Sequence, residues 1–238
     1  MDAVIEKSPR RSWLVIILRA FLSIALPFFL VLSSTRLVMT ELFLQLEYHR
    51  PGFPEDRYGF TQEDRLKYAP YAVQYLLNDS DISYLGDLEL DGLPMFEPDE
   101  LKHMEDVKVV TRAAFQIHTV LTLAVLLAVI LLTRRRATRE ALRDGLFGGG
   151  LFTLSLIVAL VVLVLANWDY FFTGFHQIFF EGDSWKFSTS DTLIRLFPEQ
   201  FWFDAALTIG FLTVFSASVL MLFAWLWHRR VISTPAPQ

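Results

Sequence analysis

The sequence contains no cysteine among its 238 residues. Disulfide bonds, thiol nucleophiles, thiolate metal sites and a lipid-modified cysteine on this chain are therefore excluded. An excess of positive charge is also missing: the formal net charge is −5, so no nucleic-acid partner is expected. The chain carries neither a glycine-rich phosphate loop nor the G-x-S-x-G turn that presents a nucleophilic serine. Any catalysis must therefore rest on other side chains.

Apolar residues are abundant, at 53% of the chain, and they are concentrated in four long stretches. About 20 mostly apolar residues are enough for a helix to cross a bilayer. The first stretch is longer than the roughly 7–15 apolar residues of a signal peptide and no A-x-A site follows it, which favours an uncleaved anchor. Gly148-Gly149-Gly150, at the start of the third stretch, indicates close helix packing. The predicted spans are 13–35, 107–133, 146–169 and 205–227.

The distribution of lysine and arginine predicts how these spans are oriented, because positive charge is enriched on the cytoplasmic side. Basic residues are concentrated in three places: before the first span, between the second and third spans, and after the fourth. They are Lys7, Arg10, Arg11, Arg134, Arg135, Arg136, Arg139, Arg143, Arg229 and Arg230. The cytoplasmic segments are therefore expected to be 1–12, 134–145 and 228–238, and the extracellular ones 36–106 and 170–204. The predicted fold is an all-α integral membrane protein with four transmembrane helices and a mainly helical extracellular cap.

The first extracellular segment has helix signals. Thr61 followed by Asp64 is a variant of the capping box, and apolar residues follow at helical spacing. The stretch 78–94 is rich in Asp, Ser and Gly and is predicted to be loop. Pro98 suits the first position of a helix, which is expected to continue into the second span.

The second extracellular segment is dense in aromatic residues. Some belong to the belt at a membrane boundary, but their number indicates that others line a pocket. These residues are Tyr170, Phe171, Phe172, Phe175, Phe179, Phe180, Trp185, Phe187, Phe197, Phe201, Trp202 and Phe203.

Three of the five histidines are expected to have structural or no particular roles. His228 lies beside arginines at the inner boundary and is interpreted as a solvated flank. His49 lies in the polar outer segment and is expected to have no role. His118 lies mid-depth in the second span, where a functional role is open. A neutral imidazole bonded to a neighbouring helix is the favoured interpretation.

The other two histidines are predicted to lie at the same depth on the outer surface. His103 precedes the second span, with Asp99, Glu100 and Asp106 near it on one helix, and any of these carboxylates could fix its tautomer. His176 follows the third span among phenylalanines, a setting that disfavours its charged form. Two such histidines suit general acid–base catalysis, although interfacial histidines without function are common.

Two further hypotheses concern the same region. His103, Asp106 and His176 could together bind a divalent metal ion, but no close-spaced ligand motif supports this alternative. Arg36, at the outer end of the first span, could hold a lipid or carboxylate group, or it could form a plain ion pair with the acidic cap.

Several motifs resemble those of the bacterial lipoprotein intramolecular transacylase family, and together they cover nearly the whole chain. They are YGFT (58–61), DRLKYA (64–69), ELKHMEDVK (100–108), FHQIFF (175–180), WKF (185–187), DTLIRLFP (191–198) and FW (201–202). The resemblance implies four transmembrane helices, an extracellular cap and an active site at the boundary between cap and membrane. It also implies that His103 and His176 are catalytic.

The implied reaction takes place within one substrate molecule, a diacylglyceryl-modified lipoprotein in the bacterial cell membrane. The acyl chain on its sn-2 oxygen moves to the α-amine of its N-terminal cysteine, giving the lyso form. No cofactor and no metal ion are expected, and the partners are the lipoprotein and membrane lipids. The residues predicted to bind the substrate are Arg36, Tyr58, Asp106, Phe175, Phe179, Trp185, Phe201 and Trp202.

Acid–base chemistry fits this reaction, because an α-amine with a pKa of about 7.7–8 must lose a proton before it attacks. The residues alone leave open which histidine is the base and which the acid. The alternative is a non-enzymatic binding or signalling subunit with an acidic extracellular cap. The distance between the two imidazoles discriminates these hypotheses, since only an enzyme needs both rings at one reacting centre.

Overall fold

The computed structural model describes residues 13–232, with the side chains of 13–227. Four long helices dominate: α1 (Trp13–Val38), α5 (Pro98–Thr133), α6 (Arg139–Ala166) and α9 (Glu199–Ile232). Within the described residues, four helices are long and apolar enough to cross a membrane, which confirms the prediction of four spans. Some predicted cytoplasmic features, Lys7, Arg10, Arg11 and the tail 234–238, lie outside the described residues, as do the side chains of His228, Arg229 and Arg230.

Shorter elements connect the long helices. They are α2 (Glu41–Tyr48), α3 (Gln62–Leu77), α4 (Ser83–Gly86), β1 (Glu89–Leu90), β2 (Leu93–Pro94), η1 (Arg136–Thr138), α7 (Trp168–Phe179) and α8 (Thr192–Leu196). The described residues form two compact units. One comprises 13–30, 119–157 and 213–232, and the other comprises 31–118 and 158–212.

The first unit is a bundle of segments from the four long helices, held together by buried leucines and alanines. Close approach at the glycine run confirms the packing that the sequence predicts. A Cβ atom on Gly149 would lie 3.0 Å from the backbone oxygen of Leu22 and 3.0 Å from Leu26 Cβ. A Cβ on Gly150 would lie 2.4 Å from Met221 Cγ. A side chain at either glycine would therefore force these helices apart.

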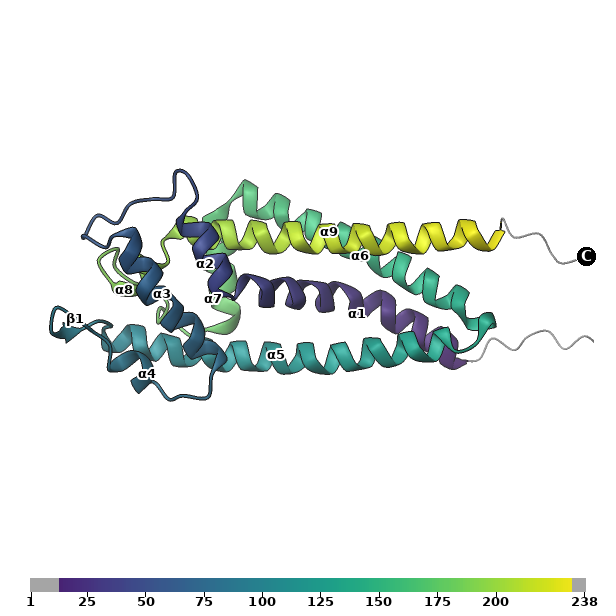
Figure 1. The fold of residues 1–238 in the computed structure, drawn as a ribbon, viewed down its shortest axis with the longest axis horizontal. Coiled ribbons are helices and arrows are strands. Elements are labelled where there is room, and N and C mark those ends of the chain that lie inside the picture. Colours follow the sequence, from purple (N-terminus) through teal and green to yellow (C-terminus); the bar gives the residue numbers. More distant parts are fainter. Residues whose placement is uncertain (1–12, 233–238) are drawn as a thin grey trace, which may run out of the picture. The chain divides into compact units, whose positions relative to one another are not determined.

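The second unit has its own core, built from the short helices and the adjoining ends of the long ones. Helices α2 and α3 pack against each other, and α3 also contacts α4 and α8 (Figure 1). Buried aromatic side chains fill the core, and Tyr48 donates a hydrogen bond of 2.9 Å to the carbonyl oxygen of Leu196 on α8. Arg65, on α3, is buried and donates to the carbonyl oxygens of Pro54 and Arg195.

Local sequence signals account for how two elements of this unit begin. Thr61 caps α3: its hydroxyl accepts from the Asp64 amide at 3.1 Å, while the Asp64 carboxylate accepts from the Thr61 amide at 2.9 Å. The predicted capping box is therefore confirmed. Helix α5 begins at Pro98 and continues without interruption to Thr133, as predicted.

The prediction that 78–94 is entirely loop is wrong, because it contains α4 and an antiparallel hairpin of β1 and β2. The turn residues Asp91 and Gly92 both have positive φ, 56° and 79°. An Asp-Gly pair is typical of a two-residue hairpin turn of this hand. The abundance of Asp and Gly was therefore a hairpin signal as much as a loop signal.

Helix α6 ends at Ala166, before the end of the predicted third span, 146–169. Asn167 accounts for the break: its side chain accepts a hydrogen bond of 2.9 Å from the amide of Tyr170 and so caps α7. Asparagine is among the most favoured residues for beginning a helix. This second start places the aromatic residues around His176 on a helix of their own.

Candidate active site

His103 lies on the second turn of α5, in the charged stretch that precedes the apolar residues expected to enter the membrane. The helix start is fixed by Glu100, whose carboxylate accepts from the Glu97 amide at 2.8 Å and from the Leu193 amide at 2.6 Å. Leu193 belongs to α8, so Glu100, which is 1% exposed, ties the two helices together. His103 is thereby presented from a fixed backbone.

The possibility that a neighbouring carboxylate fixes the tautomer of His103 through Nδ1 finds no support among the described residues. Glu100 is occupied by backbone amides, and Asp106 pairs with Lys102 at 3.4 Å. The Nδ1 atom of His103 is buried and has no hydrogen-bond partner among the described residues. The i−3 and i+3 spacings bring Glu100 and Asp106 near the imidazole, but Glu100 bonds backbone amides and Asp106 pairs with Lys102 instead.

His176 lies on α7, and here the backbone determines the tautomer. Its Nδ1 lies 2.8 Å from the carbonyl oxygen of Phe172, one turn earlier. A carbonyl oxygen can only accept, so Nδ1 carries the hydrogen of this bond. In the neutral ring Nε2 then holds an unprotonated lone pair. His176 is thus prepared to accept a proton at Nε2.

The two imidazoles lie close together although they are far apart in sequence. Their ring centroids are 6.5 Å apart and the ring planes are 23° from parallel. Two imidazoles at this separation can both lie next to one reacting group. The expected proximity of His103 and His176 is therefore confirmed.

Aromatic rings enclose the pair. Phe180 lies 5.0 Å from His103 and 5.7 Å from His176, between ring centroids, and Phe187 lies 5.3 Å from His103. Phe172 and Trp185 lie 4.1 Å and 4.6 Å from His176. The shell contains few polar atoms, so charge on either imidazole is poorly solvated.

Burial accordingly lowers the pKa of both histidines. Loss of solvation, reinforced by the neighbouring His176, lowers the pKa of His103 to about 4, with Asp106 acting in the opposite direction. Loss of solvation also lowers the pKa of His176, and its bond to Phe172 opposes this shift. The expectation that the phenylalanines disfavour charged His176 is confirmed. Both rings are neutral at neutral pH.

The metal-binding alternative finds no support in this arrangement. Asp106 is directed to Lys102 rather than to the histidines. Between residues 13 and 227, no three histidine, aspartate or glutamate side chains are grouped so that they could hold a metal ion.

Residues 20–202 match the model of one protein family, "Lipoprotein intramolecular transacylase Lit". The chain belongs to the lipoprotein intramolecular transacylase family. It is also 34% identical over 212 residues to an uncharacterized protein of Aquifex aeolicus, a match that covers 89% of this chain and 94% of that protein. The chain is accordingly a membrane-embedded transacylase, in a family that acts on lipoproteins.

Solved structures have the same fold. The lipoprotein intramolecular transacylase of Bacillus cereus superposes with a TM-score of 0.75 at 19% identity, over 92% of this chain and 98% of that one. Two structures of that protein in which one histidine is replaced, by arginine or by alanine, superpose with TM-scores of 0.70 at 18% identity. Each covers 92% of this transacylase.

Three of the residues predicted to bind substrate lie on or beside α7. Phe175 contacts His176 edge-on, with ring centroids 5.6 Å apart, and Phe179 lies 5.0 Å from Phe175. Both phenylalanines are exposed, whereas Trp185 is 9% exposed and stacks on His176. These residues join the histidine pair to an exposed apolar face of α7.

Arg36 and Tyr58 have other neighbours in this transacylase. Arg36 lies over the ring of Phe115, 4.3 Å from its centroid, and donates to the Phe115 carbonyl oxygen. No carboxylate of the described residues pairs with Arg36, so they offer no support for the ion pair with the acidic cap, one of the two alternatives for this residue. Tyr58 shares a 2.9 Å hydrogen bond with the Thr189 hydroxyl. Their roles in substrate binding stay predictions.

Phe201 and Trp202 belong to the packing of the cap. Phe201 is buried and contacts Phe43 and Tyr48, at centroid distances of 5.6 Å and 6.0 Å. Trp202 is partly exposed and packs edge-on against Phe201. Neither ring contacts a histidine, and substrate binding by these two residues also stays a prediction.

The imidazole of His118 has a hydrogen-bond partner within the second unit. Its Nε2 lies 2.9 Å from the Ser33 hydroxyl, which joins α5 to α1. The favoured interpretation of a histidine bonded to a neighbouring helix is therefore confirmed.

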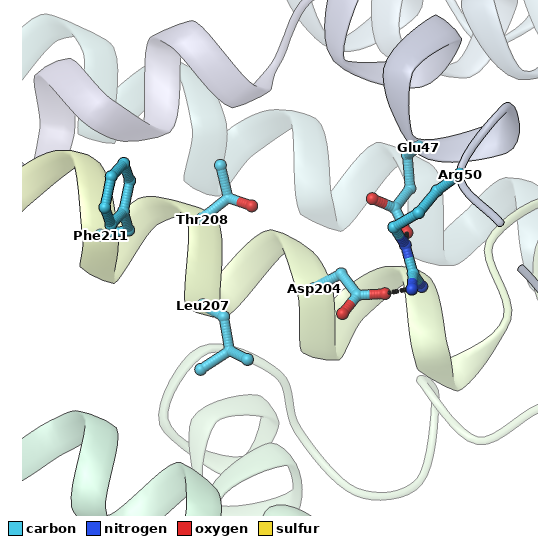
Figure 2. Close-up of a pocket in the computed structure, with 6 residues that line it drawn as sticks. All are labelled: Glu47, Arg50, Asp204, Leu207, Thr208 and Phe211. Carbon is cyan, nitrogen blue, oxygen red and sulfur yellow. Dashed lines mark hydrogen bonds and ion pairs between the residues drawn. The ribbon is translucent and has the colours of Figure 1, made fainter. Parts of the chain in front are cut away.

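A cavity of about 280 Å³ lies between the end of α2 and α9, and neither histidine of the pair lines it (Figure 2). Arg50 points from beyond α2 and bonds both Glu47, at 3.1 Å, and Asp204. Burial and a hydrogen bond with Asp204 raise the pKa of Glu47. The cavity is lined by Glu47, Arg50, Asp204, Leu207, Thr208 and Phe211. This charged cluster joins α2 to α9.

Three rings of the site were absent from the predicted binding residues: Phe172, Phe180 and Phe187. Phe172 and Phe180 lie four positions before and after His176. That spacing places side chains on one helical face, and it could have indicated both contacts. Phe187 lies beyond α7 on an irregular segment, and no sequence periodicity indicates its contact with His103.

Proposed function

We propose that this transacylase moves the acyl chain on the sn-2 oxygen of a diacylglyceryl-modified lipoprotein to the α-amine of the same molecule's N-terminal cysteine. The product is the lyso form with an N-acyl cysteine. Donor and acceptor are parts of one molecule, so the reaction needs no cofactor. The observation that carries the proposal is the near-parallel pair His103 and His176, 6.5 Å apart inside an aromatic shell.

His176 acts as the base in this proposal. Its Nδ1 is committed to the Phe172 carbonyl, which leaves the Nε2 lone pair for the amine proton. The lowered pKa of His176 keeps that lone pair unprotonated at neutral pH. The tautomer and the protonation state therefore favour the same role.

His103 lies across the reacting centre and acts as the acid for the departing glyceryl oxygen. His103 is neutral at rest, so it first takes up the proton that His176 has removed from the amine. The low pKa of His103 then makes its protonated ring a strong proton donor. Over one turnover the amine loses one proton and the glyceryl oxygen gains one. The two rings together therefore end with the protons with which they began.

The aromatic shell contributes by positioning. The diacylglyceryl group is flexible, and its ester must meet its own amine. Holding reacting groups in place can contribute about 7–11 kcal/mol in favourable cases. We propose that Phe175, Phe179 and Trp185, which connect the histidines to the exposed face of α7, hold the acyl chains.

The proposed orientation places both termini in the cytoplasm and the histidine pair at the outer leaflet. Arg134, Arg135 and Arg136 follow the apolar end of α5, whereas His103 lies near its charged beginning. The positive-inside rule then assigns the arginine end to the cytoplasm.

The test is mass spectrometry of a lipoprotein N-terminal peptide from cells that lack this pathway, with and without the protein. Expression should convert the free-amine diacyl form to the isomeric N-acyl lyso form, distinguished by fragmentation. His103→Ala and His176→Ala should each abolish conversion, whereas His49→Ala, a change at an exposed cap histidine, should not. Conversion by either single variant at near wild-type level would refute the two-histidine mechanism.

A further inference from the structure

Trp185 presents a buried hydrogen-bond donor with no acceptor. The residue is 9% exposed, and its indole Nε1 has no partner among the described residues. An indole nitrogen can only donate. Buried polar groups nearly always have partners, so each exception calls for an explanation.

The position of this donor suggests the explanation. The Trp185 ring stacks on His176, with centroids 4.6 Å apart and planes 30° from parallel. One other buried side-chain atom of residues 13–227 also lacks a partner, and it is Nδ1 of His103. Both unpartnered atoms thus belong to rings next to His176. Such clustering indicates that their hydrogen-bond partners arrive with the substrate.

Acyl transfer generates an acceptor of the right kind. When the amine attacks the ester, a carbon–nitrogen bond forms and the carbonyl π electrons move to oxygen, giving a tetrahedral oxyanion. Donors placed before the reaction are usually the largest stabilising factor for such an oxyanion. The phenylalanines around the histidines have no polar hydrogen, and His176 Nδ1 is already bonded to Phe172.

We propose that the Trp185 Nε1–H donates a hydrogen bond to the oxyanion of the tetrahedral intermediate and is therefore a catalytic residue. As the intermediate collapses, the carbon–oxygen bond to glycerol breaks, its electron pair leaves on the glyceryl oxygen, and the oxyanion reforms a carbonyl. The glyceryl oxygen takes its proton from a histidine. This assignment rests on the proposed acyl transfer at His103 and His176.

The first test is Trp185→Phe, which removes the donor and keeps an aromatic ring against His176. We expect kcat to fall by about 10²–10³-fold, the loss typical for one oxyanion donor. The KM should change little, because the bond strengthens only in the transition state. The pH profile should also keep its shape, since no titrating group is removed. Trp225→Phe is the matched control, because that tryptophan lies on α9 in the other compact unit and belongs to no part of the proposed site, and it should stay near wild-type activity.

A second measurement separates the donor from the ring shape. Replacing Trp185 by benzothienylalanine exchanges the N–H for sulfur with nearly the same outline. We also compare binding of two lipopeptides: a phosphonate that mimics the tetrahedral centre, and an ester analogue without the α-amine. Loss of the N–H should weaken phosphonate binding at least tenfold and leave ester binding unchanged.

Three results would overturn the assignment. They are Trp185→Phe activity within threefold of wild type, equal weakening of both analogues, and a shifted pH profile, which would indicate that Trp185 only positions His176. Failure of the underlying acyl transfer is distinguishable: wild-type protein would then not convert lipopeptide, or His176→Ala would retain conversion. If the wild type converts lipopeptide and the histidine variants do not, the acyl transfer stands. The Trp185 variants then test only the oxyanion donor.

Discussion

Replacement of His103 by phenylalanine should separate stability from activity. His103 is 8% exposed, its Nδ1 has no partner in the described part of the chain, and its ring neighbours Phe180 and Phe187 are apolar. An unsatisfied buried polar group costs about 1–3 kcal/mol. A phenyl ring removes that cost and occupies similar space. At neutral pH we therefore expect the free energy of unfolding of His103→Phe to equal or exceed that of the wild type, with transacylation abolished.

The same substitution should reduce the acid sensitivity of the fold. The pKa of His103 is about 4 in the folded protein and 6.5 when unperturbed. Between these values the unfolded chain binds more protons at this position than the folded chain does. The contribution of neutral His103 to the free energy of unfolding is therefore fully present above pH 6.5, and it is lost as the pH falls toward 4. This difference in pKa corresponds to a loss of roughly 3 kcal/mol of stability on acidification. The His103→Phe variant has no titrating group at this position, so it should not show this loss.

The assay is denaturant unfolding in detergent micelles at pH 7.5 and pH 4.5, paired with mass spectrometry of the lipopeptide. The exposed cap residue His49 supplies a control, since His49→Phe should keep both activity and acid sensitivity. The reasoning would fail if His103→Phe lost more than about 1 kcal/mol at pH 7.5, or lost stability with acid as steeply as the wild type.

Two other predictions concern packing and metals. Gly149→Ala should destabilise the protein by about 1–3 kcal/mol in the same unfolding assay, because its Cβ would lie 3.0 Å from the backbone oxygen of Leu22. Gly174→Ala is the matched control: open space surrounds that helical glycine, so alanine should stabilise α7 slightly, and equal effects of the two changes would contradict the packing argument. Transacylation should be unaffected by EDTA; inhibition that an added metal ion reverses would revive the metal-site hypothesis.

Local patterns in the sequence were sufficient where the structure is determined by nearby residues. The number of spans, the capping box at Thr61 and the helix start at Pro98 were predicted correctly. Each depends on apolar length or on contacts within one turn of helix. The Asp91-Gly92 hairpin depends on equally local signals, and its assignment to loop was an error of interpretation.

The composition of the histidine site could not be predicted from such patterns. Glu100 and Asp106 have the spacing to reach His103, but Glu100 caps a backbone contributed by α8 and Asp106 pairs with lysine. The sequence gives no measure of such competition, because the competing partner lies about ninety residues away in the chain. The unpartnered Nδ1 of His103 among the described residues follows from this competition, whereas burial keeps its ring neutral.

The sequence by itself determined that this chain crosses the membrane with four helices, and through its motifs it indicated the transacylase family and the two histidines. Only the tertiary structure decided that the centroids of these imidazoles lie 6.5 Å apart and that Phe172 fixes the tautomer of His176. It also decided that the indole N–H of Trp185 has no partner among the described residues. The physical reason is the separation along the chain over which each interaction acts. Hydrophobic length and capping act within a few residues, whereas burial and hydrogen-bond competition depend on side chains that only the fold brings together.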